Sequence, residues 1–311
     1  MGVVLVTGGA GVMGGRLALA LAARGDRTRV LCLPGDPAAP VLEARGLAIT
    51  YGDVTRRETL VPALLGVKTV FHLAAVVLSP DRPEVFRRVN VDGTRNLLET
   101  AEAAGASHFI FVSSVSVLYP WSNAYALSKR SGEELVKRAR LPHYTIVRPS
   151  LAYEDGGSAE FMQFVEHLRR HPVVLLPGGG RARKNPVHVE DLVQGFMALP
   201  GNPAAYGKTY HFAGGEVLTL RSLAETLLTH MGRPKPILGV PVWACRLALP
   251  VVSLWARLTG RPNPFTRQTL TGLIQDAVPD RGEAGRDLGY NPRPFSQGVS
   301  SLASLRRLSA P

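Results

Sequence analysis

The chain has 311 residues, of which 45% are hydrophobic and 19% charged, and this composition excludes a disordered protein. Its net charge of +12 indicates either an arginine-rich surface or an acidic ligand such as a dinucleotide or a nucleotide-linked substrate. Nucleic acid is not expected, because the basic residues are dispersed and no known binding module is present. The two cysteines, Cys32 and Cys245, provide neither a disulfide framework nor metal-ligand spacing, so no metal is expected.

The N-terminal stretch passes from an apolar run to a glycine-rich turn and then to a helical pattern. Val3–Val6 is expected to be a strand, and Thr7–Gly14 follows it with glycines spaced three apart. In this context glycines allow the backbone to approach a pyrophosphate, and the helix N-terminus offers its N–H groups to that anion. The residues predicted to contact a dinucleotide here are Gly8, Gly11, Val12, Met13 and Gly14.

The first half of the chain alternates between strand-like and helix-like stretches, which predicts a parallel sheet covered by helices on both faces. With right-handed crossovers this is a doubly wound α/β fold of the Rossmann type. We assign residues 1–149 to that domain, with 186–215 returning to it, and residues 150–185 and 216–311 to a smaller C-terminal substrate lobe. The expected strands are Arg29–Leu33, Leu47–Tyr51, Thr69–Leu73, His108–Val112, Tyr144–Val147 and Thr209–Ala213, and the expected helices include Phe86–Ala104, Ala159–Arg170, Leu192–Leu199 and Thr219–His230.

The end of the second strand usually decides between NAD and NADP. Cys32 and Leu33 stand there, so both the acid that binds a ribose 2′-hydroxyl and the arginine that accepts a 2′-phosphate are missing. The missing acid removes a repulsion toward phosphate. We therefore expect NAD(P) as the cofactor, with NADP slightly favoured.

Further cofactor contacts are predicted after the third and fourth strands. Asp53, which Val54 follows, can accept a hydrogen bond from the adenine amino group, cap a helix over 57–65, or do both. Small side chains in Leu73, Ala74 and Ala75 would let a cofactor lie against the sheet edge. In the next helical segment, Asn90 and Gly93 are costly residues, and this predicts a close contact there.

A tyrosine, a lysine and a serine stand at positions suited to proton transfer. Tyr125 and Lys129 are four residues apart, so on a helix they share one face. A nearby ammonium favours the phenolate and lowers the tyrosine pKa from its ordinary value of about 10. Ser114, after the fifth strand, can bond the reacting oxygen, or it can form a turn or a helix cap.

Neither a targeting segment nor a membrane span is expected. The first strand begins at about Val3, which leaves no room for a signal peptide and makes the cytoplasm the default location. The apolar run Ile237–Leu258 is interrupted by two prolines and by Arg246 and Arg257, whereas a span needs roughly 20 apolar residues with few charges. Peripheral membrane contact is the most that this run predicts.

Taken together, the motifs resemble the extended short-chain dehydrogenase/reductase family. This resemblance implies that Tyr125 is the acid/base, that Lys129 holds the nicotinamide ribose and lowers the tyrosine pKa, and that Ser114 orients the substrate oxygen. It also implies hydride transfer between the nicotinamide and a carbinol carbon, with Pro149 beside the cofactor. The stretches that carry the resemblance are Thr7–Gly14, Gly52–Val54, His72–Ala75, Asn90–Thr94, Ser113–Ser114, Tyr125–Lys129, Val147–Pro149 and Val187–Asp191.

The substrate is less well marked. Trp121, in a short loop, is expected either to touch substrate or to pack that loop. Lys184 stands where nucleotide-sugar enzymes often carry an arginine for the diphosphate, and Arg181 and Arg183 are the alternatives for that contact. The leading interpretation is an epimerase, dehydratase or ketoreductase of a nucleotide-linked sugar.

Two alternatives stay open. The first resembles the 3β-hydroxysteroid dehydrogenase and dihydroflavonol reductase branch, in which the apolar segment Val240–Leu258 would help to receive a hydrophobic ketone. The second is an NAD(P)H-binding accessory protein without turnover, similar to the subunit of respiratory complex I. The family resemblance further implies a homodimer in which Phe86–Ala104 and Tyr125–Arg138 form a four-helix bundle.

Overall fold

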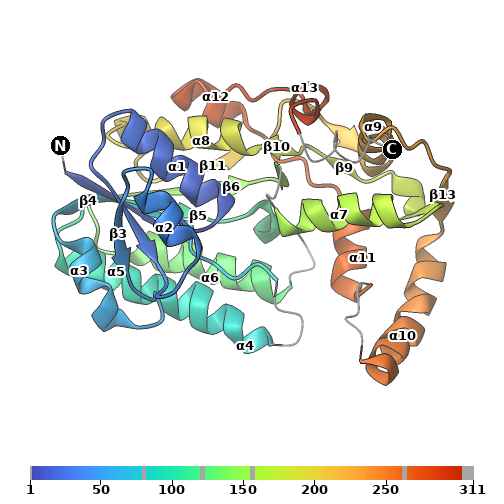
Figure 1. The fold of residues 1–311 in the computed structure, drawn as a ribbon, viewed down its shortest axis with the longest axis horizontal. Coiled ribbons are helices and arrows are strands. Elements are labelled where there is room, and N and C mark those ends of the chain that lie inside the picture. Colours follow the sequence, from blue (N-terminus) through green and yellow to red (C-terminus); the bar gives the residue numbers. More distant parts are fainter. Residues whose placement is uncertain (1, 79–81, 120–122, 155–157, 261–264, 303–311) are drawn as a thin grey trace. The chain divides into compact units, whose positions relative to one another are not determined.

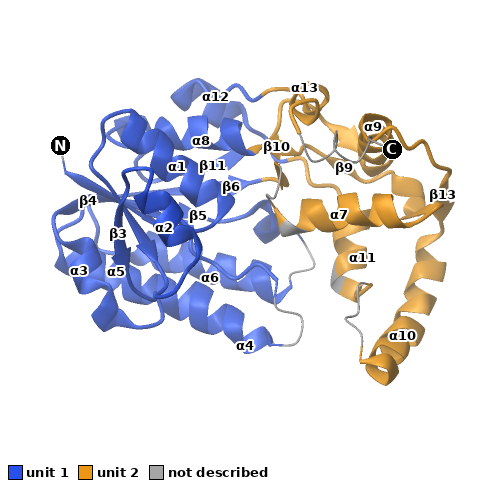
Figure 2. Cartoon of the chain, viewed as in Figure 1, with its two compact units in different colours: residues 1–149, 189–212, 279–292 blue, residues 150–188, 213–278, 293–311 orange. Residues whose placement is uncertain are grey.

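The computed structural model describes residues 2–78, 82–119, 123–154, 158–260 and 265–302 (Figure 1). The chain divides into two compact units (Figure 2). Unit 1 comprises residues 1–149, 189–212 and 279–292, and unit 2 comprises residues 150–188, 213–278 and 293–311.

Unit 1 is built on a sheet that, among the described residues, has seven strands in the order β11-β6-β5-β4-β1-β2-β3. All neighbouring pairs are parallel, and the order reverses between β1 and β4. Ligands of open α/β sheets bind at such a switch point, outside the carboxyl ends of the strands. This confirms the predicted doubly wound fold. The strands are β1 (Val3–Thr7), β2 (Thr28–Cys32), β3 (Ala48–Tyr51), β4 (Val67–His72), β5 (His108–Val112), β6 (His143–Pro149) and β11 (Lys208–Phe212).

Helices cover both faces of this sheet: α1 and α8 pack together on one face, and α5 and α6 lie on the other (Figure 1). The predicted helix over Phe86–Ala104 is split into a π-helical stretch, η2, and α5. The helical elements of unit 1 are α1 (Val12–Ala23), α2 (Ala38–Glu43), η1 (Arg57–Thr59), α3 (Val61–Leu64), α4 (Pro83–Val85), η2 (Phe86–Asp92), α5 (Gly93–Ala103), η3 (Val115–Leu118), α6 (Ala124–Arg138), α8 (Val189–Met197), η5 (Pro203–Ala205) and α12 (Gly282–Leu288).

The core of unit 1 lies on either side of the central strands. Every residue of β1 and of β5 is buried, which is the pattern of parallel strands covered on both faces. Phe71, Phe109 and Phe111 are fully buried, and burial of each such side chain stabilises the fold by roughly 1.5–3 kcal/mol. The central strands of the sheet are therefore packed on both faces.

The unit boundaries differ from the sequence-based assignment: the returning segment is 189–212 where 186–215 was predicted, and residues 279–292 lie in unit 1 although 216–311 was assigned to the second lobe. Polar and ring contacts hold this segment against β11. Lys208 Nζ pairs with Glu283 at 2.6 Å, the Tyr210 hydroxyl donates to Asp287 at 2.9 Å, and the rings of Phe212 and Tyr290 stack at 4.5 Å. Such a short, polar helix has too little apolar periodicity for its return to be read from sequence.

Unit 2 has its own core, in which α7 (Ala159–Arg170) packs against α9 (Leu220–His230) through Phe161, Val165, Leu223 and Leu227. Small two-stranded pairings complete it: β7 with β10 and β8 with β13 are parallel, and β9 with β12 is antiparallel. The remaining elements of this unit are β7 (Ala152–Tyr153), β8 (Val174–Pro177), η4 (Gly178–Gly180), β9 (Arg183–Lys184), β10 (Val187–His188), β12 (Leu218–Thr219), β13 (Ile237–Val240), α10 (Val242–Thr259), α11 (Arg267–Ile274) and α13 (Phe295–Val299).

Candidate cofactor and catalytic site

The glycine turn between β1 and α1 uses its glycines in two different ways. Gly8 has φ +71°, and a Cβ there would lie 2.7 Å from the backbone nitrogen of Ala74. A Cβ at Gly14 would lie 2.3 Å from the carbonyl oxygen of Gly8, so both glycines permit close backbone packing. Gly11 is exposed, and a Cβ there would meet only the Gly8 oxygen, at 3.3 Å. Gly11 therefore faces open space at the N-terminus of α1.

That helix N-terminus is suited to an anion. Gly11 is the N-cap of α1, and the first turn carries no acidic residue. The N–H groups at the start of a helix have no intrahelical partner and carry the positive end of the helix dipole. The Gly11 amide already donates to the Gly8 carbonyl at 3.1 Å, so the amides of Val12 and Met13, at the start of α1, are the ones placed to hold the pyrophosphate of a dinucleotide.

The end of β4 is fixed by a buried hydrogen-bond chain. Thr7 Oγ1 bonds His72 Nδ1 at 2.8 Å, and His72 Nε2 bonds Thr94 Oγ1 at 2.9 Å. The backbone amide of Ala74 donates to Thr7 Oγ1 at 3.2 Å. Burial, reinforced by the charge of Lys129, lowers the pKa of His72 to about 3, so the ring is neutral. This chain of bonds positions Leu73, Ala74 and Ala75, which are half-buried beside the glycine turn.

Asn90 and Gly93 make the close contacts predicted for them, and their partners are other residues of this chain. The Asn90 side chain bonds both the amide and the carbonyl of Val76, at 2.8 and 2.9 Å, and donates to Ser128 Oγ on α6 at 2.9 Å. A Cβ at Gly93 would lie 2.7 Å from a methyl group of Val54. Asn90 lies in the π-helical stretch η2, a conformation that is frequent at functional sites.

Asp53 stabilises a turn, so the alternative that it caps the following helix is wrong. Its Oδ1 accepts the amide of Thr55 at 2.8 Å, whereas the N-cap of η1 is Arg56, which makes no side-chain cap. Val54 is buried in the core, and its carbonyl accepts from Asn96 at 3.0 Å.

The end of β2 contains a carboxylate that the sequence reading missed. Cys32 is buried and Leu33 is 52% exposed, but the chain then turns back through Gly35, at φ +78°, and the Asp36 amide bonds the Leu33 carbonyl. Burial raises the pKa of the Cys32 thiol, and the charge of Asp36 adds to this effect. Asp36 also accepts the amide of Ala38 at 2.9 Å, where it supports the start of α2. The sequence Pro34-Gly35-Asp36 is typical of a turn and could have indicated that the chain reverses here.

Helix α6 carries the tyrosine and lysine of the predicted catalytic pair. It begins where the Asn123 side chain accepts the amide of Ala126 at 2.6 Å. Tyr125 is half-buried, and its ring lies edge-on to Phe86 at 6.4 Å. Lys129 is 3% exposed, and its Nζ lies 4.6 Å from the centre of the Phe111 ring. Burial lowers the pKa of Lys129 to about 7, although the charge of Glu133 opposes that effect.

The two serines after β5 have different surroundings. Ser113 is buried and donates to Glu133 Oε1 at 2.6 Å. Ser114 is half-buried, and its Oγ accepts the amide of Ser116 at 3.2 Å as the N-cap of η3. The capping alternative stated for Ser114 is thus present. Because a hydroxyl has a donor as well as lone pairs, the cap leaves its proton available to a substrate oxygen.

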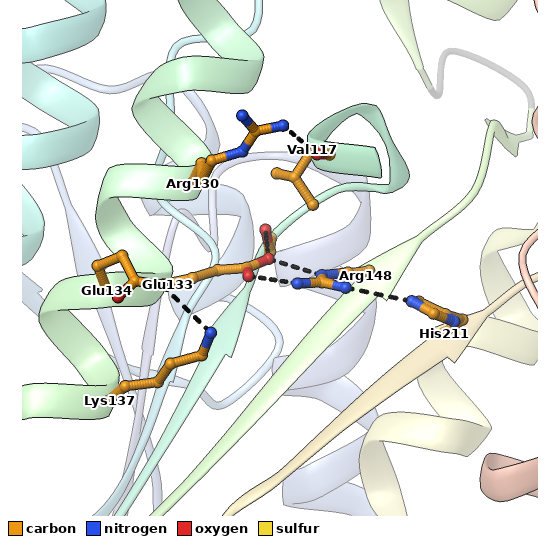
Figure 3. Close-up of polar contacts among 8 residues, drawn as sticks. Val117, Arg130, Glu133, Glu134, Lys137, Arg148 and His211 are labelled. Carbon is orange, nitrogen blue, oxygen red and sulfur yellow. Dashed lines mark hydrogen bonds and ion pairs between the residues drawn. The ribbon is translucent and has the colours of Figure 1, made fainter. Parts of the chain in front are cut away.

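A buried ion pair beneath the site was missed from sequence. Figure 3 shows Glu133 reaching from α6 to Arg148 on β6, with His211 of β11 next to it. Two bonds of 2.8 and 2.6 Å join the guanidinium to the carboxylate, which is 2% exposed. Burial raises the pKa of Glu133, but the hydrogen bonds from Arg148 and Ser113 outweigh it and the net pKa is lowered. In the sequence, the one indication of this role was that Glu133 stands one helical turn after Lys129, on the same face of the predicted helix.

The model of the NAD dependent epimerase/dehydratase family matches residues 4–213, more than half of the chain. This protein belongs to that family. The predicted place among extended short-chain dehydrogenases/reductases is confirmed, and so is its nature as an oxidoreductase of this type with a nicotinamide dinucleotide cofactor.

Similar proteins extend along most of the chain. The 4-hydroxy-2-methyl-3-oxo-4-farnesyl-3,4-dihydroquinoline-1-oxide ketoreductase of Stigmatella aurantiaca is 29% identical over 318 residues, covering 96% of this chain and 94% of that one. The ceramide reductase of Caulobacter vibrioides is 32% identical over 264 residues, covering 85% and 81%. A double mutant of the dTDP-glucose 4,6-dehydratase DesIV from Streptomyces venezuelae, solved with NAD, has the same fold with a TM-score of 0.75, 24% identity and coverage of 99% and 97%.

The residues predicted to contact substrate differ in their exposure to solvent. Lys184 is buried, and its ammonium donates to the carbonyls of Gly272 and Gln275 at 2.8 and 2.6 Å. It therefore stabilises the end of α11, which argues against the predicted diphosphate contact. Arg181 is exposed and, with Arg221, lines a pocket of about 300 Å³ in unit 2. Trp121 lies outside the described residues.

Gly11→Val is expected to weaken NAD(P) binding at least tenfold while leaving the melting temperature nearly unchanged. The added side chain enters the space that the pyrophosphate needs, and little protein stands there. Calorimetric titration with each dinucleotide measures the affinity. Gly14→Val is the matched comparison, because its side chain would collide with the Gly8 backbone and destabilise the fold itself. Unchanged affinity in the first variant would remove the cofactor from this turn.

Glu133→Gln is expected to lower the free energy of unfolding by roughly 3–5 kcal/mol, because Arg148 then keeps its charge in a largely buried position without a carboxylate. Glu134→Gln is the control: its 3.3 Å pair with Lys137 is exposed, and its loss should cost less than about 1 kcal/mol. Urea denaturation followed by circular dichroism measures both. Equal, small losses would contradict a structural role for the buried pair.

Proposed function

We propose that Tyr125 exchanges a proton with a substrate oxygen, that Lys129 holds the ribose and lowers the tyrosine pKa, and that Ser114 orients that oxygen. The observation that carries this proposal is the buried ammonium of Lys129, one turn from Tyr125 on the same face of α6. When bound, the nicotinamide dinucleotide supplies or accepts the hydride. In the reductive direction the tyrosine hydroxyl protonates the forming alkoxide, and in the oxidative direction the phenolate removes the alcohol proton.

The surroundings of the pair support this assignment. The ion pair of Glu133 with Arg148 anchors α6 to β6, and Asn90 bonds Ser128 between Tyr125 and Lys129. Both contacts restrict the helix on which the two side chains stand. In its protonated form Lys129 would favour the phenolate of Tyr125 and so lower the pKa of that tyrosine.

We further propose that the substrate is a hydrophobic ketone, in place of the nucleotide-linked sugar favoured from sequence. The two relatives described above are named for a farnesylated quinoline oxide and for ceramide, both of which carry long apolar groups. The burial of Lys184 also removes one of the cations predicted for a diphosphate. The exposed Arg181 and its neighbour Arg221 are the observation that favours the nucleotide-sugar alternative.

A substrate panel separates these possibilities. We expect oxidation of the reduced cofactor, followed by absorbance, with long-chain and steroid ketones and none with UDP- or dTDP-linked keto sugars. Tyr125→Phe is included as the inactive control for each compound. Turnover confined to the sugars would restore the first interpretation. Cofactor binding without turnover of any compound would favour the accessory-protein alternative.

Tyr125→Phe is expected to reduce turnover about 10²–10⁴-fold, because the acid/base is lost, while cofactor affinity and fold persist. Lys129→Met removes the charge that favours the phenolate, so its activity should recover in part at higher pH, whereas Tyr125→Phe should not recover. Ser114→Ala should lower turnover without changing cofactor affinity. Steady-state rates across a pH series test this, and wild-type turnover in Tyr125→Phe would refute the assignment.

We propose NADP as the preferred cofactor, supported by the absence of an acid at Cys32 and Leu33. Wild type should bind NADP more tightly than NAD, Leu33→Arg should increase the difference, and Cys32→Asp should reverse it. Asp36→Asn is the informative comparison, because Asp36 is the carboxylate near this strand end. A wild type that prefers NAD and loses that preference in Asp36→Asn would contradict the proposal and assign the ribose contact to Asp36. Isothermal titration measures all four proteins.

The predicted homodimer stays a proposal. On the described residues of η2, α5 and α6, Leu127 is the one large hydrophobic side chain exposed, and Arg88, Arg95 and Glu134 are charged positions of the same helices. A bundle of these helices would therefore depend on polar contacts as well as on Leu127. Light scattering at micromolar concentration distinguishes the dimer from a monomer.

A further inference from the structure

Helix α10 in unit 2 presents an unusual surface to water. It runs from Val242 to Thr259, with Pro250 inside it, and Gly260 is its C-cap, with a φ of 64°. Six large apolar side chains along it are each 48–78% exposed, and the buried residues on it are small, Cys245 and Ala256. The six are Trp243, Leu247, Val251, Leu254, Trp255 and Leu258. Soluble proteins rarely leave so continuous an apolar strip uncovered unless it binds something.

The side chains are sorted by type around the helix. At 3.6 residues per turn, the six exposed apolar residues fall within a sector of about 120°, and Cys245 and Ala256 point to the opposite side. Arg246 and Arg257 fall together, roughly 40–60° beyond the Trp243 edge of the strip. Both arginines are exposed, and the helix contains no Asp or Glu. Its surface thus consists of an apolar strip with a cationic border.

This arrangement fits a helix that lies along a membrane surface. Its length, its apolar composition and its low burial within the protein would also permit a span, but the two arginines lie on the same side of the helix. A span would draw Arg246 and Arg257 into the hydrocarbon, where charged side chains are costly. Lying flat, the helix places its apolar side chains at the acyl boundary, its two tryptophans at the interface they favour, and its arginines at the phosphates.

We propose that α10 docks this protein on an anionic phospholipid surface. Charge selects this occupant over a second copy of the chain: in a symmetric pairing of two α10 helices each would bring the same arginines, and neither would bring a carboxylate to meet them. The net charge of +12 adds a long-range attraction to anionic lipid. The inference does not rest on the proposed activity, because no residue of α10 belongs to the proposed catalytic site.

Vesicle flotation with the full chain tests the proposal. Wild type should float with vesicles of equal phosphatidylcholine and phosphatidylglycerol, bind phosphatidylcholine alone at least tenfold more weakly, and dissociate as salt is raised. Tryptophan fluorescence should shift to shorter wavelength with the anionic vesicles. A wild type that remains in solution with both vesicles overturns the proposal, and equal binding to both overturns its electrostatic part.

Two pairs of variants assign the contact to α10. Leu247→Gln with Leu258→Gln should reduce vesicle binding at least tenfold, whereas Leu175→Gln, at an exposed leucine elsewhere in unit 2, should not. Arg246→Gln with Arg257→Gln should abolish the preference for phosphatidylglycerol, whereas Arg233→Gln should retain it. Circular dichroism and cofactor affinity should match wild type in every variant. If the leucine variant instead converts a dimer to a monomer by light scattering, with no effect on vesicles, the strip is an interface between two copies.

Discussion

The buried ion pair between Glu133 and Arg148 is the interaction on which the site depends. It joins α6 to β6, and Ser113 ties the same carboxylate to the end of β5. A carboxylate in this position is costly to desolvate and persists only because its oxygens accept three hydrogen bonds. Since α6 also carries Tyr125 and Lys129, the ion pair fixes the helix on which the proposed catalytic residues stand.

A second set of constraints shapes the place for the cofactor. Gly8 allows the turn after β1 to touch the loop after β4, and the Thr7–His72–Thr94 chain holds that loop from below. Neutral His72 is required here, because a protonated ring would be buried near the Lys129 ammonium. Backbone proximity and hydrogen bonding therefore shape the turn that is predicted to hold the pyrophosphate.

The ion pair and the glycine turn both lie in unit 1, at or near the carboxyl edge of its sheet. The carboxyl edge of the sheet and α6 carry the residues that we propose for cofactor binding and proton transfer, and a fold that hosts many chemistries does not by itself select a substrate. Selection must come from features outside that edge. Of the residues predicted to contact substrate, Arg181 is exposed in unit 2, whereas Lys184 is held by carbonyl groups of the protein.

The sequence by itself determined the doubly wound sheet, the glycine turn and the one-face placement of Tyr125 and Lys129. These are local properties: apolar runs, glycine spacing and a four-residue separation specify strands, turns and helix faces without knowledge of distant partners. Close contacts at Asn90 and Gly93 were also foreseen, because both residues are unfavourable inside a helix. Their partners, Val76, Ser128 and Val54, were not.

Only the tertiary structure decided which polar groups meet. The return of residues 279–292 to β11, the pairing of Glu133 with Arg148 and the burial of Lys184 each join segments far apart in sequence or depend on what covers a side chain. Asp36 reaches the end of β2 only because the turn at Gly35 reverses the chain. Such contacts depend on which strands and helices become neighbours in space, and the spacing of residues along one element does not specify its neighbours.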